Sequence, residues 1–291
     1  MTSATDPRRA LAATRLIATD LDGTLLRDDK SVSDRTVAAL AAAERAGIEV
    51  FFVTGRPARW MHVVSAHVHG HGLAICANGA AVVDLHAGGE VLKVRALAHD
   101  TALGVVHALR DAAPGTSFAV ETTAGFYHEP EYSAPFLQHN LESTVAVADA
   151  EKLLAAPGPG IDTQVIKLLA HHPELDPDAF LTVARAAAGG LASITRSSPT
   201  ALLEISGPGV SKASTLALCC AERGISADEV VAFGDMPNDV EMLNWAGTSY
   251  AMGNAHPEVI AAASGRTVAN NEDGVAVVIE QILRELPQRT G

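Results

Sequence analysis

The stretch Leu16-Ile17-Ala18-Thr19-Asp20-Leu21-Asp22-Gly23-Thr24 decides the fold of this chain. Its first four residues predict a buried strand, which runs directly into two carboxylates and a glycine that lets the backbone turn sharply. An apolar strand does not need two acids at its end for stability, so this strand end is a candidate functional site. Two acids separated by one residue suit a division of labour in which one carboxylate attacks and the other transfers a proton, provided that a cation offsets their repulsion.

A second acidic cluster, Gly234-Asp235-Met236-Pro237-Asn238-Asp239, follows the apolar run at residues 230–233. The carboxyl ends of parallel strands meet at one edge of a doubly wound sheet, which is where such folds bind ligands. Together the two clusters form an oxygen-rich site suited to magnesium, whereas a plain acidic turn would explain only one of them. An EF-hand calcium loop starting at Asp20 is excluded, because its sixth and twelfth positions hold Leu25 and Ser31 instead of glycine and glutamate.

Donors for a phosphate group follow other predicted elements. Thr54-Gly55-Arg56 ends another apolar run and offers a hydroxyl, a backbone amide and the N-terminus of a helix predicted from Pro57. Lys212 lies in the first turn of a predicted helix, where a lysine opposes the helix dipole but suits a phosphate as a point charge. Ser211-Lys212-Ala213 is not the ending of a P-loop, and no third glycine completes a dinucleotide fingerprint. Asn78-Gly79 predicts a tight hairpin turn near the same strand ends.

Strand-like and helical patterns alternate in both outer parts of the chain. A helix predicted over residues 33–46 is capped by Ser33 and closed by Gly47, with strand candidates at residues 16–19 and 50–53 on either side. The alternation resumes with strands predicted at residues 230–233 and 249–252 and helices at residues 211–222, 238–245 and from Gly274. This order predicts parallel strands joined by crossover helices.

The middle of the chain has a different pattern. Strand candidates at residues 117–121 and 164–170 are interleaved there with helix candidates near residues 101–112 and 178–188. We therefore predict an α/β fold with a doubly wound, Rossmann-like parallel-sheet core over residues 1–84 and 199–291. An inserted α+β cap domain is predicted over residues 85–198.

Composition limits the partners and the compartment. The 291 residues are 48% hydrophobic and 19% charged, which is enough for a sizeable core, and the length suits one large or two modest domains. A formal net charge of -13 repels nucleic acid and anionic membrane surfaces, so neither is an expected partner. No secretory signal or membrane-spanning run is present, and we expect a cytoplasmic protein with a short disordered leader. The oligomeric state stays open.

Cysteine and histidine contents point to no further metal site. Cys76, Cys219 and Cys220 are too few and too poorly spaced for a disulfide framework or a four-cysteine zinc site, and we expect buried thiols. The alternating trio formed by His67, His69 and His71 is interpreted as a set of exposed loop side chains rather than a soft-metal site.

The motifs, in this order, resemble the haloacid dehalogenase superfamily, specifically its Cof-type phosphatases with a large α/β cap of the C2 type. Asp20-Leu21-Asp22-Gly23-Thr24 is similar to the nucleophile motif, Thr54-Gly55-Arg56 to the second motif, Lys212 to the third and residues 234–239 to the fourth. Residues 77–80, 251–255 and 271–276 also look like this family. Ala213 departs from it, because relatives often carry glycine after the lysine.

The resemblance implies a magnesium-dependent phosphatase of small phosphate monoesters, such as sugar phosphates or phosphorylated cofactors, which works through an aspartyl-phosphate. Asp20 would be the nucleophile and a metal ligand, Asp22 the general acid and base with its backbone carbonyl on the metal, and Asp235 the third protein ligand. The implied phosphate-binding groups are the amide of Leu21, Thr54, the amide of Gly55, Lys212 and Asn238. The implied supporting residues are Asp239, Asn78 and Arg56.

Other functions remain open within the same superfamily. A sugar phosphomutase would share the acidic motifs but return the phosphoryl group to its substrate, and it would need a bisphosphate activator. A non-catalytic sensor of phosphorylated metabolites would lack the catalytic acid, and here all the acids are present. Phosphoryl-aspartate ion pumps are excluded, because they carry threonine where Asp22 stands and need membrane helices. In the predicted cap, Glu121, Tyr127, His128 and Lys167 could face substrate, but no sequence signal separates them from ordinary surface.

Overall fold

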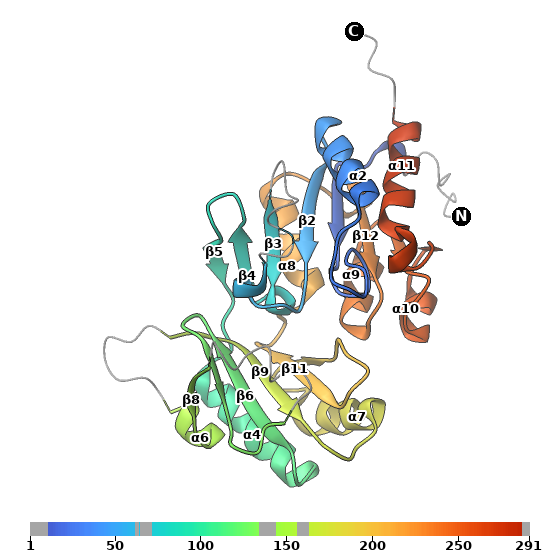
Figure 1. Ribbon diagram of the computed structural model, residues 1–291. Helices are drawn as coiled ribbons and strands as arrows, with labels where there is room; N and C mark the ends of the chain where they lie inside the picture. Colours follow the sequence, from blue (N-terminus) through green and yellow to red (C-terminus); the bar gives the residue numbers. More distant parts are fainter. Residues whose placement is uncertain (1–10, 62–63, 65–71, 134–143, 156–162, 287–291) are drawn as a thin grey trace, which may run out of the picture. The chain divides into compact units, whose positions relative to one another are not determined.

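The computed structural model describes residues 11–61, 64, 72–133, 144–155 and 163–286 and divides the chain into two compact units (Figure 1). Unit 1 comprises Met1–Leu92 and Lys212–Gly291, and unit 2 comprises Lys93–Ser211. Both boundaries of unit 2, residues 93 and 211, therefore lie later in the chain than the cap boundaries expected from the sequence, residues 85 and 198. The second difference arises because strand β11 (Leu202–Ser206) pairs with β9 (Val165–His171) in the sheet of unit 2. A local strand pattern does not show which sheet the strand joins.

Unit 1 is built on an eight-stranded sheet with the order β14-β13-β12-β1-β2-β3-β4-β5. From β14 to β3 each strand runs parallel to its neighbour, and β4 runs antiparallel to β3. The strands are β1 (Leu16–Thr19), β2 (Glu49–Val53), β3 (Leu73–Cys76), β4 (Ala81–Asp84), β5 (Glu90–Val94), β12 (Val230–Gly234), β13 (Thr248–Ala251) and β14 (Gly265–Arg266). The predicted parallel α/β arrangement is confirmed.

Helices cover both faces of this sheet, as a doubly wound fold requires. They are α2 (Asp34–Arg45), α8 (Lys212–Glu222), α9 (Val240–Trp245), α10 (Pro257–Ala262) and α11 (Gly274–Glu285). Short 3₁₀ segments are η1 (Ala58–Trp60), η2 (Ala77–Gly79), η4 (Ala227–Glu229), η5 (Pro237–Asp239) and η6 (Asn270–Glu272). The Ser33 hydroxyl accepts a hydrogen bond from the amide of Thr36, so the predicted N-cap of α2 is confirmed.

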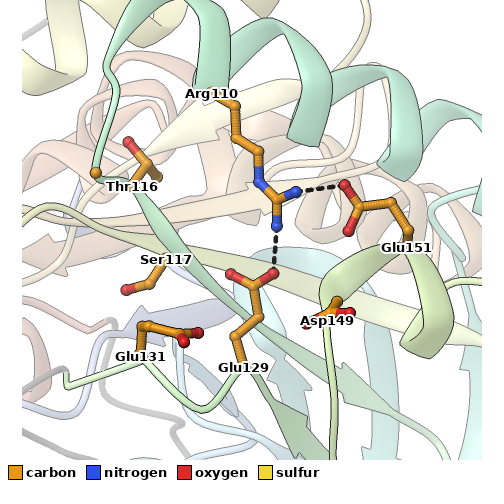
Figure 2. Close-up of a pocket in the computed structure, with 8 residues that line it drawn as sticks. Arg110, Thr116, Ser117, Glu129, Glu131, Asp149 and Glu151 are labelled. Carbon is orange, nitrogen blue, oxygen red and sulfur yellow. Dashed lines mark hydrogen bonds and ion pairs between the residues drawn. The ribbon is translucent and has the colours of Figure 1, made fainter.

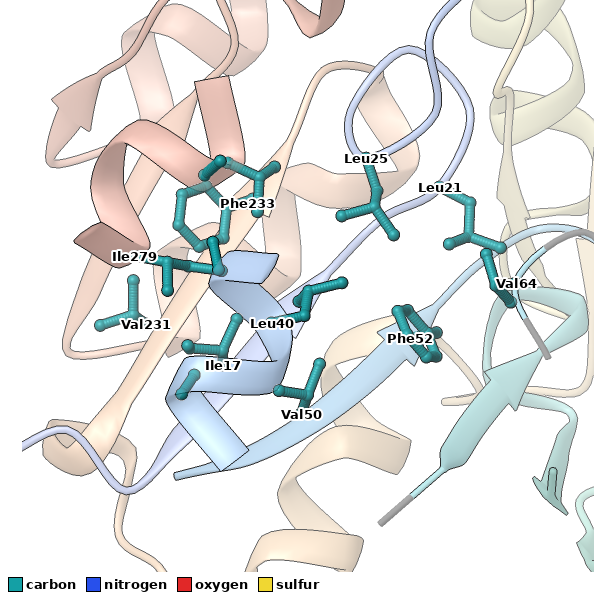
Figure 3. Packing of buried hydrophobic residues seen from close by; sticks show 14 of the residues in the cluster. Ile17, Leu21, Leu25, Leu40, Val50, Phe52, Val64, Val231, Phe233 and Ile279 are labelled. Carbon is teal, nitrogen blue, oxygen red and sulfur yellow. The ribbon is translucent and has the colours of Figure 1, made fainter. Parts of the chain in front are cut away.

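Successive side chains of the central strands point to opposite faces and so build two cores. Ile17 and Phe52 pack against Leu40 of α2 and Ile279 of α11 in the cluster of Figure 3. Leu16, Ala18 and Phe51 pack on the other face against α8, α9 and α10. Full burial of one such large aliphatic or aromatic side chain stabilises the fold by roughly 1.5–3 kcal/mol. This burial on both faces fixes β1, and with it the carboxylates that follow it.

Unit 2 has a six-stranded sheet with the order β10-β11-β9-β6-β7-β8, antiparallel except for the β7–β8 pair. Its further strands are β6 (Ser117–Thr122), β7 (Phe126–His128), β8 (Thr144–Val147) and β10 (Ser193–Thr195), and its helices are α4 (His99–Ala112), α6 (Ala150–Leu153) and α7 (Pro177–Ala188). Phe118 and Leu168 pack with Val105 of α4 and Phe180 of α7 in one core cluster. The α+β composition expected of the middle segment is confirmed.

Several local expectations have definite outcomes. At Pro57, where the sequence predicted a helix to begin, the backbone is extended, and the short η1 starts at the next residue. The hairpin at Asn78 joins β3 and β4 as predicted. All three cysteines are buried and none forms a disulfide bond, as expected. Within the described part, no helix is long and apolar enough to cross a membrane. His67, His69 and His71 lie outside the described residues.

Candidate active site

The carboxyl ends of β12, β1 and β2 lie side by side in unit 1. The amide of Asp20 donates to the carbonyl of Phe233 (3.1 Å), so Asp20 leaves the sheet beside the end of β12. Thr54 is held at the end of β2 in the same way, because its amide donates to the carbonyl of Ile75 (2.8 Å). The predicted gathering of functional side chains at this sheet edge is therefore a consequence of strand pairing.

Lys212 joins two carboxylates of the site. Its Nζ donates to Oδ1 of Asp20 and to Oδ1 of Asp239, each at 2.6 Å, and the lysine side chain is fully buried. The second oxygen of Asp239 accepts from the amides of Asp235 (3.0 Å) and Met236 (3.1 Å). Asp239 thus fixes both the turn after β12 and the position of the lysine.

Burial sets the protonation of this cluster. Desolvation raises the pKa of Asp20 well above its usual value, and the nearby Lys212 ammonium only partly counters this. Burial, followed by the charge of Asp239, raises the pKa of Asp235 to about 7. Burial would lower the pKa of Lys212, but the two carboxylates outweigh it, so the pKa is raised and the lysine stays charged. Three buried carboxylates are left with one ammonium.

This shortage of positive charge fits a divalent cation. Asp20, Asp235 and Asp239 each offer a buried carboxylate oxygen, and these oxygens lie within 4.8 Å of one another. Carboxylate oxygens are the ligands that magnesium prefers, and a cation would offset the repulsion between acids that adds to burial in raising the pKa of Asp20 and Asp235. The residues present therefore fit the metal that the sequence motifs imply.

Asp22 stands apart from these buried acids. Its Oδ2 accepts from Nε of Arg56 (2.6 Å), and its Oδ1 accepts from Nη2 of Arg56 (2.7 Å) and Nζ of Lys30 (2.9 Å). Burial would raise the pKa of Asp22, but the hydrogen bonds and charges of Arg56 and Lys30 outweigh it and lower the pKa to about 2. The Asp22 side chain is 39% exposed, so it is accessible as well as oriented.

Two glycines let the acidic segments approach each other. A Cβ on Gly23, whose φ is +76°, would lie 2.2 Å from Oδ2 of Asp235. A Cβ on Gly234 would lie 2.4 Å from the Cβ of Asp239. The hydroxyl of Thr24 uses this closeness to donate to Oδ1 of Asp235 (2.8 Å). Glycine is required at position 23 by both its backbone angle and the available space.

The remaining predicted phosphate-binding residues lie around the same strand ends. Oγ1 of Thr54 accepts from the amide of Arg56 (3.1 Å), and Nδ2 of Asn238 donates to Oδ1 of Asn78 (3.1 Å). Oδ1 of Asn238 is buried and has no hydrogen-bond partner among the described residues, which suits a group that meets a ligand. The Leu21 side chain is buried in the core of Figure 3, so only its backbone can serve the site. Gly55 follows Thr54 directly.

Sequence reasoning missed Lys30. It belongs to none of the motifs, and a lysine in a charged surface turn is ordinarily solvated. Its one unusual feature is conformational, since its φ is +67°. No sequence signal indicated this angle, because glycine and asparagine are the residues that favour it.

The family model for haloacid dehalogenase-like hydrolases matches residues 17–279. The chain belongs to this family. The motif resemblance is confirmed, and the protein is an enzyme of the hydrolase class. A 5-amino-6-(5-phospho-D-ribitylamino)uracil phosphatase of Bacillus subtilis is 30% identical over 266 residues, which are 91% of this chain and 94% of the relative. A pyridoxal phosphate phosphatase of Escherichia coli is 30% identical over 286 residues, which are 91% of this chain and 97% of the relative.

Solved structures agree with the family assignment. A haloacid dehalogenase-like hydrolase from B. subtilis superposes with a TM-score of 0.77 at 25% identity, covering 92% of this chain and 99% of the other. A phosphatase of the haloalkanoate enzyme superfamily from Bacteroides thetaiotaomicron superposes with a TM-score of 0.75 at 26% identity, covering 97% and 99% of the two chains.

Unit 2 of this hydrolase contains a pocket of about 340 Å³ (Figure 2). Arg110 forms ion pairs there with Glu129 and Glu151, and Glu131 and Asp149 complete the lining of charged residues. Four acids around one arginine repel a phosphate group, so the pocket does not suit the anion that the unit 1 motifs would bind.

The four cap residues noted in the sequence do not share one face. Glu121 and His128 lie on the sheet face opposite α4 and α7, and Lys167 lies in register with Glu121. Tyr127 packs instead against the cluster formed with these helices. Lys167 pairs with Glu204 (2.7 Å), and both side chains are buried.

Proposed function

We propose that this hydrolase is a magnesium-dependent phosphatase of small phosphorylated metabolites that works through an aspartyl-phosphate on Asp20. The observation that carries the proposal is the buried Asp20 carboxylate at the end of β1, held by the Lys212 ammonium at 2.6 Å beside two further acids. A carboxylate so placed suits covalent catalysis, because its neighbours can offset the charge of an incoming phosphoryl group.

The residues of this chain have distinct parts in the proposed reaction. A carboxylate oxygen of Asp20 attacks phosphorus, and the bond from phosphorus to the leaving oxygen breaks. Asp22, in its protonated form, gives a proton to that oxygen, and the product is an alcohol and an acyl-phosphate on Asp20. Asp22 then takes a proton from a water molecule, which attacks the acyl-phosphate and releases inorganic phosphate.

The remaining groups bind and orient the phosphoryl group in this proposal. Lys212 and the hydroxyl of Thr54, the amides of Leu21 and Gly55, and Asn238 would hold its oxygens. Magnesium would be held by Asp20, Asp235 and the backbone carbonyl of Asp22, with Asp239 supporting the site. The cation, when bound, supplies positive charge that offsets the phosphoryl charge. Asn78 would orient Asn238, to which it is hydrogen-bonded.

The substrate class follows from what the assigned residues leave open. The residues assigned to catalysis, to the metal and to phosphate binding would contact only the phosphoryl group, the metal or the leaving oxygen, so we expect unit 1 to treat many monoesters alike. We assign the choice of leaving group to unit 2, and relatives named for a ribityl phosphate and for pyridoxal phosphate support a range of sugar phosphates and phosphorylated cofactors. Three cysteines that form no disulfide bond support a reducing compartment such as the cytoplasm.

One assay tests this function. A panel of phosphate monoesters is incubated with the purified protein and magnesium, and both inorganic phosphate and the dephosphorylated product are measured. We expect release of both from several members, with preferences that change when unit 2 is replaced by that of a relative. Isomerised sugar phosphate as the main product would instead identify a mutase, and binding without turnover would identify a sensor.

A further inference from the structure

The Asp22 carboxylate is held by cations from two separate segments. Arg56, at the end of β2, binds both of its oxygens, and Lys30 adds a third bond of 2.9 Å from the loop that follows Asp22. Arg56 belongs to a recognised motif, whereas Lys30 belongs to none. The family motifs therefore do not explain why Lys30 lies beside Asp22.

The backbone of Lys30 is in the left-handed region, with φ at +67°. A non-glycine residue adopts this conformation only where the surrounding structure imposes it, and such residues cluster at functional sites. The turn is closed by bonds from the Lys30 amide to the Arg27 carbonyl (2.9 Å) and from the Arg27 amide to the Ser31 carbonyl (3.0 Å). Oδ1 of Asp29 also accepts from the Ser31 amide (2.9 Å).

This turn is braced by asparagines from the far end of the chain. Nδ2 of Asn270 donates to the Leu26 carbonyl and to Oδ1 of Asp28, each at 3.0 Å. Asn271 exchanges two bonds with Asp28, one from its Nδ2 to Oδ2 (2.7 Å) and one from the Asp28 amide to its Oδ1 (3.1 Å). Arg27 adds an ion pair with Asp273 (2.8 Å).

A third asparagine ties the start of the same loop. Nδ2 of Asn254 donates to the carbonyl of Gly23 (2.8 Å), and its Oδ1 accepts from the amide of Asn270 (3.0 Å). The loop is thus held at the residue after Asp22 and again at the turn that carries Lys30. The segments at residues 251–255 and 271–276, which have no part in the proposed phosphoryl transfer, both contribute to this brace.

We propose that Lys30 is a positioning residue for Asp22, and that Asn254, Asn270 and Asn271 form the brace that holds Lys30 in place. The inference rests on the proposed function, since it matters only if Asp22 passes a proton to the leaving group. An ordinary exposed ion pair would not need a left-handed lysine, a closed turn and a buried asparagine to support it. Together these contacts direct one ammonium at one carboxylate oxygen.

Lys30→Gly separates positioning from folding. Glycine accepts the left-handed backbone without strain, so we expect a melting temperature at or above that of the parent protein. Loss of a charge-assisted hydrogen bond should lower kcat roughly 10- to 100-fold for an alkyl phosphate, whose leaving group needs the proton. The kcat for 4-nitrophenyl phosphate, whose leaving group departs without a proton, should fall much less. Lys30→Arg should restore most of the alkyl activity, and Asn270→Ala should repeat the selective loss.

Two further variants make the outcome decisive. Arg35→Gln removes an exposed ion pair with Glu280 in the same unit and should leave kcat for both substrates unchanged. Asp22→Asn tests the proposed function on which the inference rests, because it should impair hydrolysis of the alkyl ester far more than hydrolysis of the aryl ester. If Asp22→Asn affects both esters equally, the proton-transfer role assigned to Asp22 is wrong. If Asp22→Asn is selective but Lys30→Gly is not, or if Lys30→Gly loses both activities equally, the positioning role of Lys30 is refuted.

Discussion

Gly23→Ala is the substitution whose effect can be worked out most directly from the structure. The added Cβ would lie 2.2 Å from Oδ2 and 2.8 Å from Cγ of Asp235, where an ordinary contact begins at 3.4 Å. Asp235 is only 6% exposed and is held by Thr24, so it cannot move outward freely. Either the carboxylate or the loop carrying Asp22 must shift by about an ångström, and misplacement of that size costs about 100-fold in rate.

The stability cost has two parts. A non-glycine residue at φ +76° lowers the free energy of unfolding by about 1–2 kcal/mol, and overpacking against Asp235 lowers it further, by about 1–3 kcal/mol. Gly88→Ala is the matched control, because Gly88 has a similar φ of +71° but nothing within 4 Å of the added Cβ. Gly88→Ala should be destabilised only by the backbone strain and should keep its activity.

Urea denaturation and phosphate release, measured on both variants, test this reasoning. We expect Gly23→Ala to be the less stable of the two and to lose about 100-fold in kcat/KM at saturating magnesium. If it keeps more than about a third of the parent activity, a shift of this size does not occur, and the proposed joint role of Asp22 and Asp235 fails.

Three further outcomes follow from the same geometry. Asp20→Asn should keep the fold, by circular dichroism, and abolish turnover, and a purified variant retaining more than a few per cent of activity would exclude Asp20 as the nucleophile. Lys212→Met should lower the free energy of unfolding by about 3–5 kcal/mol without magnesium, because it leaves two buried carboxylates unpaired; an unchanged urea midpoint would contradict the buried network. Excess chelator should remove activity and added magnesium restore it, and full activity in chelator would rule out the metal.

The parts of the fold predicted from sequence are those with local signals. The apolar run before Asp20, the hydroxyl cap at Ser33 and the hairpin at Asn78 each depend on residues close in the chain, and each lies where it was expected. The gathering of Asp20 and Asp235 was also predictable, because parallel pairing of β1 with β12 brings their ends together.

The parts that were not predicted depend on contacts between distant segments. The sheet that β11 joins is decided by its pairing with β9, which local strand propensity does not encode. Lys30 reaches Asp22 only through a left-handed turn that Asn270 braces from the other end of the sequence. Lysine is not among the residue types that favour that conformation, so a pattern-based analysis does not place it there.

Charge balance connects the local geometry with the acidity of the whole chain. Among the described residues of unit 1, the four carboxylates of Asp20, Asp22, Asp235 and Asp239 meet three cations, Lys30, Arg56 and Lys212, each of which already bonds a carboxylate. A phosphate ester brings further negative charge to a site whose positive charges are already engaged by carboxylates, in a protein of net charge -13. A divalent cation returns the site close to its starting balance, whereas without one burial and the charge of Asp239 favour the protonated form of Asp235, whose pKa is raised to about 7. Phosphate and magnesium should therefore bind together, each raising the affinity for the other.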